Sequence, residues 1–248
     1  MEKAPNFGED YKPEQIGHAY DSSYDKQRLE NTENPPASEV VDFVRSYREM
    51  LGRKILDIGS GAGRNLLYLS REGFEPTGID ISEEGARLTR EQLERENLNG
   101  NMVIGDVGQL PIANESFDSA ISRRVYDYNN TEGVNEKLRE TARVLKPGGI
   151  FFVTLRSSAQ PIKANEELVE ENQWSGKTLK VSGGSEDGLF QHHFTEEEVR
   201  ALSDEAGFEV LEVAKNSKVN KKGEQKSELR IVLKKSNRTD SNPSTSLG

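Results

Sequence analysis

Apolar residues in this chain gather in short runs, and most of these runs are separated by longer segments with a helical period. Five of the runs have the length of strands: 55–58, 74–80, 102–106, 119–122 and 150–155. The run 150–155 is apolar at almost every position, as in a central parallel strand that is buried on both faces. Five alternations of strand and helix predict an α/β fold with a doubly wound, mostly parallel sheet.

The alternation of strands and helices stops after the fifth predicted strand. Residues 156–194 have no long helical period, and we expect a cap insertion there. Thr195-x-x-Glu198 reads as a capping box that opens a final helix. The segments 208–215 and 229–234 alternate in polarity, which predicts a strand hairpin.

These patterns divide the chain into three parts. We expect one domain over residues 37–235, with the insertion 156–194 inside it. The polar leader, residues 1–36, carries aromatic residues that could pack on the domain surface or act as a lid. The tail, residues 236–248, is rich in Ser, Asn, Thr and Pro and is expected to be disordered.

Composition narrows the function classes. The formal net charge of −10 disfavours nucleic acid as a partner, because nucleic-acid binders usually show a basic surface. The chain has no cysteine and three histidines, so we expect neither a disulfide nor a metal site. No apolar run reaches the length of a membrane span, and we predict a cytoplasmic protein. The oligomeric state is left open.

A glycine turn follows the first predicted strand. Residues 54–65 read K-I-L-D-I-G-S-G-A-G-R-N. Glycines permit a tight turn and let backbone N–H groups approach a ligand. The spacing Gly-x-Gly-x-Gly differs from the dinucleotide fingerprint, whose third glycine would fall on Arg64. No Gly-Lys-Ser/Thr follows, which excludes a Walker-type phosphate loop.

Four further motifs accompany this turn. They are G-I-D-I-S at 78–82, Gly-Asp at 105–106, Phe-Asp at 117–118 and L-K-P-G-G at 145–149. With D-I-G-S-G-A-G, this order resembles the class I S-adenosylmethionine-dependent methyltransferases over about residues 40–155. The resemblance implies a seven-stranded, Rossmann-like sheet with the last strand antiparallel between the fifth and sixth. It also implies S-adenosyl-L-methionine as cofactor and S-adenosyl-L-homocysteine as product.

The resemblance assigns cofactor contacts to particular residues. Asp57 would reach the methionine ammonium or bond the amides of its own turn, and Asp80 would bind both ribose hydroxyls. Ile81 would flank the adenine, which Asp106 and Val107 would hydrogen-bond, although Asp106 could simply end a strand in a turn. The full predicted set is Asp57, Gly59, Ser60, Gly61, Gly63, Asp80, Ile81, Asp106, Val107 and Arg123.

The pair Arg123-Arg124 departs from the family pattern. Small or apolar residues are commoner at this place, where the family lines the methyl donor. The two arginines indicate either an anionic substrate or a salt bridge, and the sequence leaves both open.

Methyl transfer from a sulfonium needs a general base only when the acceptor must lose a proton. The predicted catalytic residues are His192, His193 and Tyr126, with Asp127 and His18 as further candidates. Paired histidines beside a helix cap are more often structural.

The predicted function is methyl transfer to a small molecule. The small acceptor is inferred from the acidic charge and from the lack of an appended recognition domain. Two alternatives stay open: a protein or tRNA methyltransferase, and a non-catalytic S-adenosylmethionine-binding regulatory protein.

Overall fold

The structure is a computed structural model that describes residues 35–128, 131–219, 223 and 225–237. Nearly all of the predicted leader and tail, and with them His18, lie outside the described residues. Within these ranges, no helix is long and apolar enough to cross a membrane.

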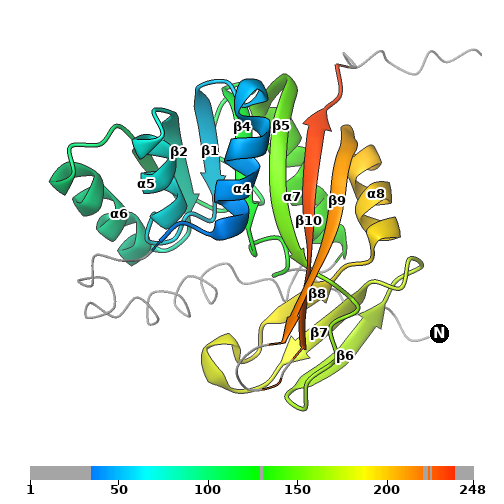
Figure 1. The fold of residues 1–248 in the computed structure, drawn as a ribbon. Helices are drawn as coiled ribbons and strands as arrows, with labels where there is room; N and C mark the ends of the chain where they lie inside the picture. The colour runs from blue at the N-terminus through cyan, green and yellow to red at the C-terminus, as the bar shows by residue number, and fades with distance from the viewer. Residues whose placement is uncertain (1–34, 129–130, 220–222, 224, 238–248) are drawn as a thin grey trace, which may run out of the picture.

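A seven-stranded sheet forms the centre of the domain, in the order β3-β2-β1-β4-β5-β10-β9 (Figure 1). Its first five strands are parallel, and β10 is antiparallel to both of its neighbours, β5 and β9. The predicted fold is therefore confirmed. The strand bounds are β1 Lys54–Ile58, β2 Glu75–Asp80, β3 Asn101–Ile104, β4 Phe117–Arg123, β5 Leu145–Arg156, β9 Phe208–Val219 and β10 Gln225–Lys235.

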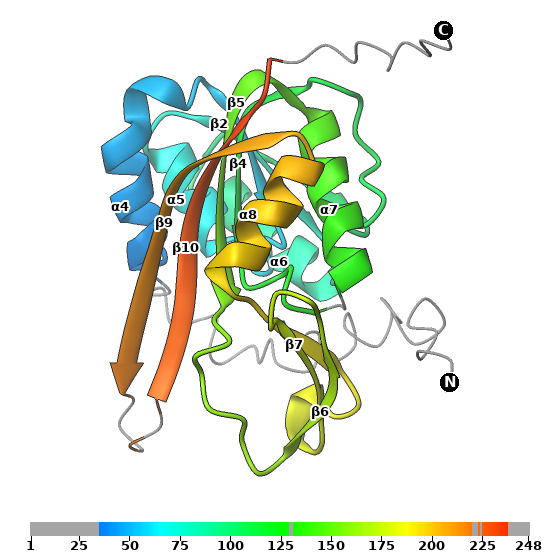
Figure 2. The same cartoon turned by 90° about the vertical axis from the view of Figure 1, so that its right-hand side faces the viewer.

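Helices cover both faces of this sheet (Figure 2). Successive strand residues point to opposite faces. Phe152 accordingly stacks on Phe43 of α4 with the ring centroids 4.6 Å apart, whereas Phe151 packs against Phe208 and Tyr126 on the face of α7 and α8. The helix bounds are α4 Ser38–Tyr47, α5 Arg64–Arg71, α6 Glu83–Arg95, α7 Thr131–Val144 and α8 Glu196–Glu205, with a short 3-10 helix η1 at Arg48–Met50.

A second, smaller sheet lies at the carboxyl end of β5 (Figure 1). Its three antiparallel strands are β6 Glu166–Glu171, β7 Lys177–Val181 and β8 Phe190–His193, with the 3-10 helix η2 at Gly184–Glu186 before β8. All three strands lie within the predicted insertion, residues 156–194, but the sequence pattern does not reveal them.

Candidate functional site

The glycine turn lies against the end of the neighbouring strand β2. Ile58 pairs with Ile79, and the N–H groups of Gly59 and Ser60 both donate to the Ile79 carbonyl, at 2.8 and 3.1 Å. These two amides are engaged within the protein. They hold the turn against β2, and the predicted cofactor contacts of Gly59 and Ser60 stay a prediction.

Backbone conformation and close packing both require glycine in the turn. Gly59, Gly61 and Gly63 have φ values of 70°, 55° and 79°, a region that other residues rarely adopt. A Cβ on Gly59 would lie 2.1 Å from the Val125 side chain, and one on Gly63 would lie 2.6 Å from Thr89.

Thr89 of α6 also holds the glycine turn in place. Its hydroxyl lies 3.1 Å from the Gly61 carbonyl and 2.9 Å from the Gly85 carbonyl. The sequence does not reveal this role of Thr89, because a single threonine within a helical pattern carries no signal of a tertiary contact. The Ser60 hydroxyl lies 3.2 Å from the Met102 sulfur and is buried. That position argues against a direct cofactor contact by the Ser60 side chain.

Asp80 ends β2 and faces the turn. One carboxylate oxygen accepts the Gly61 N–H at 2.7 Å, and the other accepts the Ser82 N–H at 2.9 Å. Ser82 itself caps α6 by accepting from the Gly85 N–H at 2.8 Å, as its sequence position suggests. A carboxylate oxygen can accept more than one hydrogen bond, so the two oxygens fit the two hydroxyls of a ribose. The adjacent Ile81 is half-buried.

Asp57 is a buried carboxylate beside the turn. It is 1% exposed, and its Oδ2 has no hydrogen-bond partner among the residues that the structure describes. Burial, and secondly the negative charge of Asp80, raise the Asp57 pKa to about 7. An unpaired buried carboxylate oxygen suits a positively charged group such as the ammonium of S-adenosylmethionine. The residues present therefore fit this cofactor.

Asp106 and Val107 follow β3 in the chain. Asp106 Oδ1 accepts the Gly108 N–H at 2.9 Å, so the carboxylate supports a local turn and remains half-exposed. Val107 is buried in the core that β1, β4 and β5 share with α7 and α8. The adenine contact of Asp106 and Val107 stays a prediction.

The two unusual arginines form salt bridges. Arg123 Nε lies 2.5 Å from Glu39 Oε1 on α4, and Arg124 Nε lies 2.7 Å from Asp127 Oδ2. Glu39 is only 7% exposed, so Arg123 is held by a buried partner. This pairing favours the salt-bridge interpretation and argues against the predicted role of Arg123 in cofactor binding.

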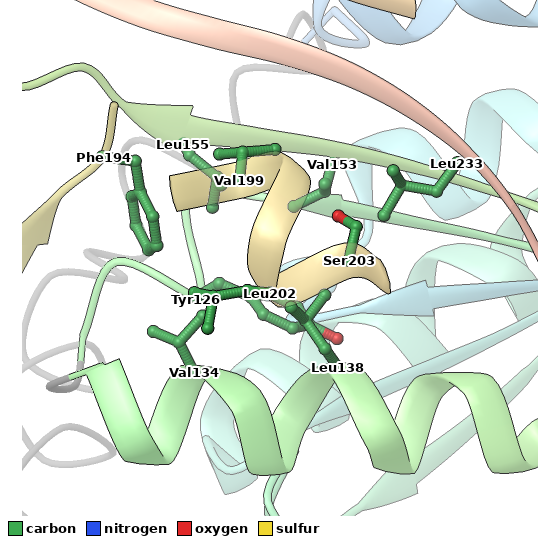
Figure 3. Close-up of a pocket in the computed structure, with 10 residues that line it drawn as sticks. All are labelled: Tyr126, Val134, Leu138, Val153, Leu155, Phe194, Val199, Leu202, Ser203 and Leu233. Atoms are coloured by element: carbon green, nitrogen blue, oxygen red, sulfur yellow. The ribbon is translucent and has the colours of Figure 1, made fainter. Parts of the chain in front are cut away.

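Tyr126 lies in the hydrophobic core (Figure 3). Its ring is fully buried, and its hydroxyl is hydrogen-bonded to Thr141 on α7. It borders an apolar cavity of about 10 Å³, which is too small for a substrate. Asp127 is also buried, and its Oδ1 accepts the Arg156 N–H at 2.8 Å. Their positions argue against catalytic roles for both residues.

The two adjacent histidines of β8 have different surroundings. His192 is fully buried, with Nδ1 2.9 Å from the Thr178 hydroxyl and Nε2 2.8 Å from Glu198 Oε1. Because both ring nitrogens are paired, a structural role accounts for His192. His193 is also fully buried, but neither of its ring nitrogens has a hydrogen-bond partner in the described ranges. Adjacent strand residues point in opposite directions, which explains the difference.

Comparisons with known proteins agree with this geometry. A family model described as a methyltransferase domain matches residues 55–149. The demethylmenaquinone methyltransferase of Tropheryma whipplei is 35% identical over 103 residues, which are 41% of this chain and 41% of that protein. The arsenite methyltransferase of Halobacterium salinarum is 29% identical over 170 residues, which are 66% of this chain and 39% of that protein. The chain thus spans about two-fifths of the length of these curated relatives.

Solved structures share the fold. The 1,6-didemethyltoxoflavin-N1-methyltransferase of Burkholderia thailandensis, solved with 1,6-didemethyltoxoflavin and S-adenosylhomocysteine bound, superposes with a TM-score of 0.66 at 17% identity. The superposition covers 91% of each chain. At this identity the superposition shows the shared fold, while the family model shows that residues 55–149 are similar to a methyltransferase domain.

Proposed function

We propose that this chain transfers a methyl group from S-adenosyl-L-methionine to a small-molecule acceptor. The observation that carries the proposal is the position of two carboxylates, those of Asp57 and Asp80, beside the glycine turn. One carboxylate is buried with an unpaired oxygen, and the other is oriented by two backbone N–H groups. Two carboxylates arranged in this way suit a ligand with an ammonium at one end and a ribose at the other.

Each residue of the site has a defined task in this proposal. Asp57 would accept from the ammonium, Asp80 from the ribose hydroxyls, and Asp106 from the adenine amino group. When bound, the cofactor supplies a methyl group on a positively charged sulfonium. The protein contributes by holding the acceptor in line with that methyl group and by excluding water. His193, which the sequence suggests as a general base, is fully buried in the second sheet near the end of β5.

A small acceptor is supported by charge and by similarity. The net charge of −10 disfavours docking on a phosphate backbone. The names of the three compared proteins each state a small compound: demethylmenaquinone, arsenite and 1,6-didemethyltoxoflavin. These acceptors belong to those proteins, and here they support only the general class.

Methyl-labelled S-adenosylmethionine tests the proposal. The full chain is incubated with the labelled cofactor and a broad small-molecule panel, with bulk protein, and with tRNA. We expect label in a small molecule, and we expect the Asp80→Ala variant to lose that transfer. Label that enters only protein or tRNA would contradict the small acceptor, and no transfer to any acceptor would favour a regulatory cofactor-binding role.

A further inference from the structure

Three buried polar side chains at one place have hydrogen-bonding groups without a partner. Gln191 is 1% exposed, His193 0% and Arg156 7%. Within the described part of the chain, both amide atoms of Gln191, both ring nitrogens of His193 and Nη1 of Arg156 are unpaired. Buried polar groups are paired in the large majority of cases, so three unsatisfied neighbours need an explanation.

Strand geometry brings the three residues together. Gln191 and His193 are two positions apart on β8 and therefore share a face of the small sheet. Arg156 ends β5, and its carbonyl accepts the Phe194 N–H at 2.7 Å, directly after β8. The Arg156 charge is also one of the causes that lower the His193 pKa. His192 points to the opposite face, where its ring nitrogens are paired.

Neighbouring carboxylates offset the charge of Arg156. Its Nε lies 3.9 Å from Asp127 Oδ2, and its Nη2 lies 3.5 Å from Glu186 Oε1. The remaining Nη1 offers a donor without an uncompensated charge. Burial, and then the charge of Arg156, lower the His193 pKa to about 4, which leaves the imidazole neutral at pH 7. A neutral imidazole has one donor and one acceptor nitrogen.

We propose that Gln191, His193 and Arg156 bind the methyl acceptor, a neutral polar molecule that presents a carbonyl oxygen beside an N–H or O–H group. This inference rests on the proposed function. The three side chains together offer both donors and acceptors. A carboxylate or phosphate only accepts, so it would leave the Gln191 oxygen and one His193 nitrogen unpaired.

The position in the fold suits an acceptor site. In the sheet, β5 follows β4, which pairs with β1, the strand that leads into the glycine turn. Arg156 ends β5 at the edge where the parallel strands have their carboxyl ends. Ligands of open α/β sheets bind at this edge. The small sheet lies at the same end of β5 (Figure 1).

Binding of simple probes tests the inference. Uracil and 2-pyridone carry a carbonyl beside a ring N–H, and benzoate is the acceptor-only comparison. Each is titrated at millimolar concentration into the full chain saturated with S-adenosylhomocysteine. We expect uracil or 2-pyridone to bind more tightly than benzoate. In Gln191→Leu this binding should weaken by about 10- to 100-fold, while S-adenosylhomocysteine binds as in wild type.

A stability measurement separates binding from a structural role. Because Gln191 is buried and unpaired, Gln191→Leu should raise the melting temperature of the ligand-free protein, by about 2–4 °C. Phe190→Leu, on the opposite face of β8, is the matched control and should leave probe binding unchanged.

The outcomes separate this inference from the proposed function. If wild type fails to bind S-adenosylhomocysteine, the proposed function fails, and this inference fails with it. If S-adenosylhomocysteine binds, three results would overturn the acceptor site alone: no binding of uracil or 2-pyridone, benzoate binding at least as tightly, or a Gln191→Leu variant with a lowered melting temperature.

Discussion

The carboxylate of Asp80 accepts the Gly61 N–H at 2.7 Å and so joins the end of β2 to the glycine turn after β1. A second bond, from the Ser82 N–H at 2.9 Å, fixes the other oxygen. The carboxylate is therefore oriented before any ligand arrives. Such preorganisation reduces the entropy that binding would otherwise cost.

Replacing Asp80 should destabilise the free protein. Asp80→Ala removes the acceptor for two backbone N–H groups, and we expect the free energy of unfolding to fall by about 1–3 kcal/mol. Urea unfolding without ligand measures this. Thr195→Ala, which removes the cap of α8 far from the turn, is a control that should lose similar stability while it retains S-adenosylhomocysteine binding. An Asp80→Ala variant as stable as wild type would contradict the bridging role.

Asp57→Asn should improve stability and impair binding. The substitution removes a buried carboxylate whose Oδ2 is unpaired, so stability at pH 8 should rise by about 1–3 kcal/mol. The affinity for S-adenosylhomocysteine should fall by about 10- to 100-fold, because a charged partner for its ammonium is lost. Denaturant unfolding and calorimetry measure the two effects. A variant that loses stability but retains affinity would show that Asp57 serves the turn alone.

The raised pKa of Asp57, about 7, predicts a pH dependence. Its unfolded-state pKa is near the usual value of 3.8, so the folded protein binds the extra proton between these two values. Stability should therefore fall as pH rises through this window and level off above about pH 7. Denaturant unfolding as a function of pH should show a smaller fall in Asp57→Asn than in wild type.

Cofactor binding should show the opposite trend. An ammonium favours the ionised form of Asp57, so binding releases a proton below about pH 7. The affinity for S-adenosylhomocysteine should then rise by up to about tenfold per pH unit toward pH 7 and flatten above it. Calorimetry in two buffers of different ionisation enthalpy counts the released proton. Equal slopes in wild type and Asp57→Asn would rule Asp57 out as the source.

The network around Glu198 should matter for stability alone. Glu198→Ala leaves His192 Nε2 and the Asn172 amide without their buried partner, and should cost about 2–5 kcal/mol. Glu196→Ala, two residues earlier, removes only an exposed pair with Arg200 and should cost at most about 1 kcal/mol. Urea unfolding compares them. Equal losses would mean that the buried network contributes little.

The sequence predicts the main sheet because local pattern and tertiary position agree there. The run 150–155 is apolar throughout and forms the buried part of β5. Glu166–Glu171, in contrast, reads E-E-L-V-E-E, without the alternation typical of a strand. Its pairing with β7 depends on the tertiary structure, so periodicity does not reveal it.

The sequence predicts residues of the candidate site only where a motif places them at a defined position in a strand or turn. Asp57, the glycines and Asp80 belong to a continuous strand–turn–helix–strand pattern. The pair His192-His193 is visible in the sequence, but which ring is paired depends on the face of β8 that each occupies. Thr195-x-x-Glu198 forms only half of the predicted capping box: Thr195 accepts the Glu198 N–H, while the Glu198 carboxylate binds His192.

Asp80 and the glycine turn are proposed to form the S-adenosylmethionine site. Isothermal titration of S-adenosylhomocysteine into wild type and Asp80→Ala measures this. We expect micromolar binding by wild type and a loss of at least about tenfold in the variant. No binding by wild type, or equal affinity in both proteins, would contradict it.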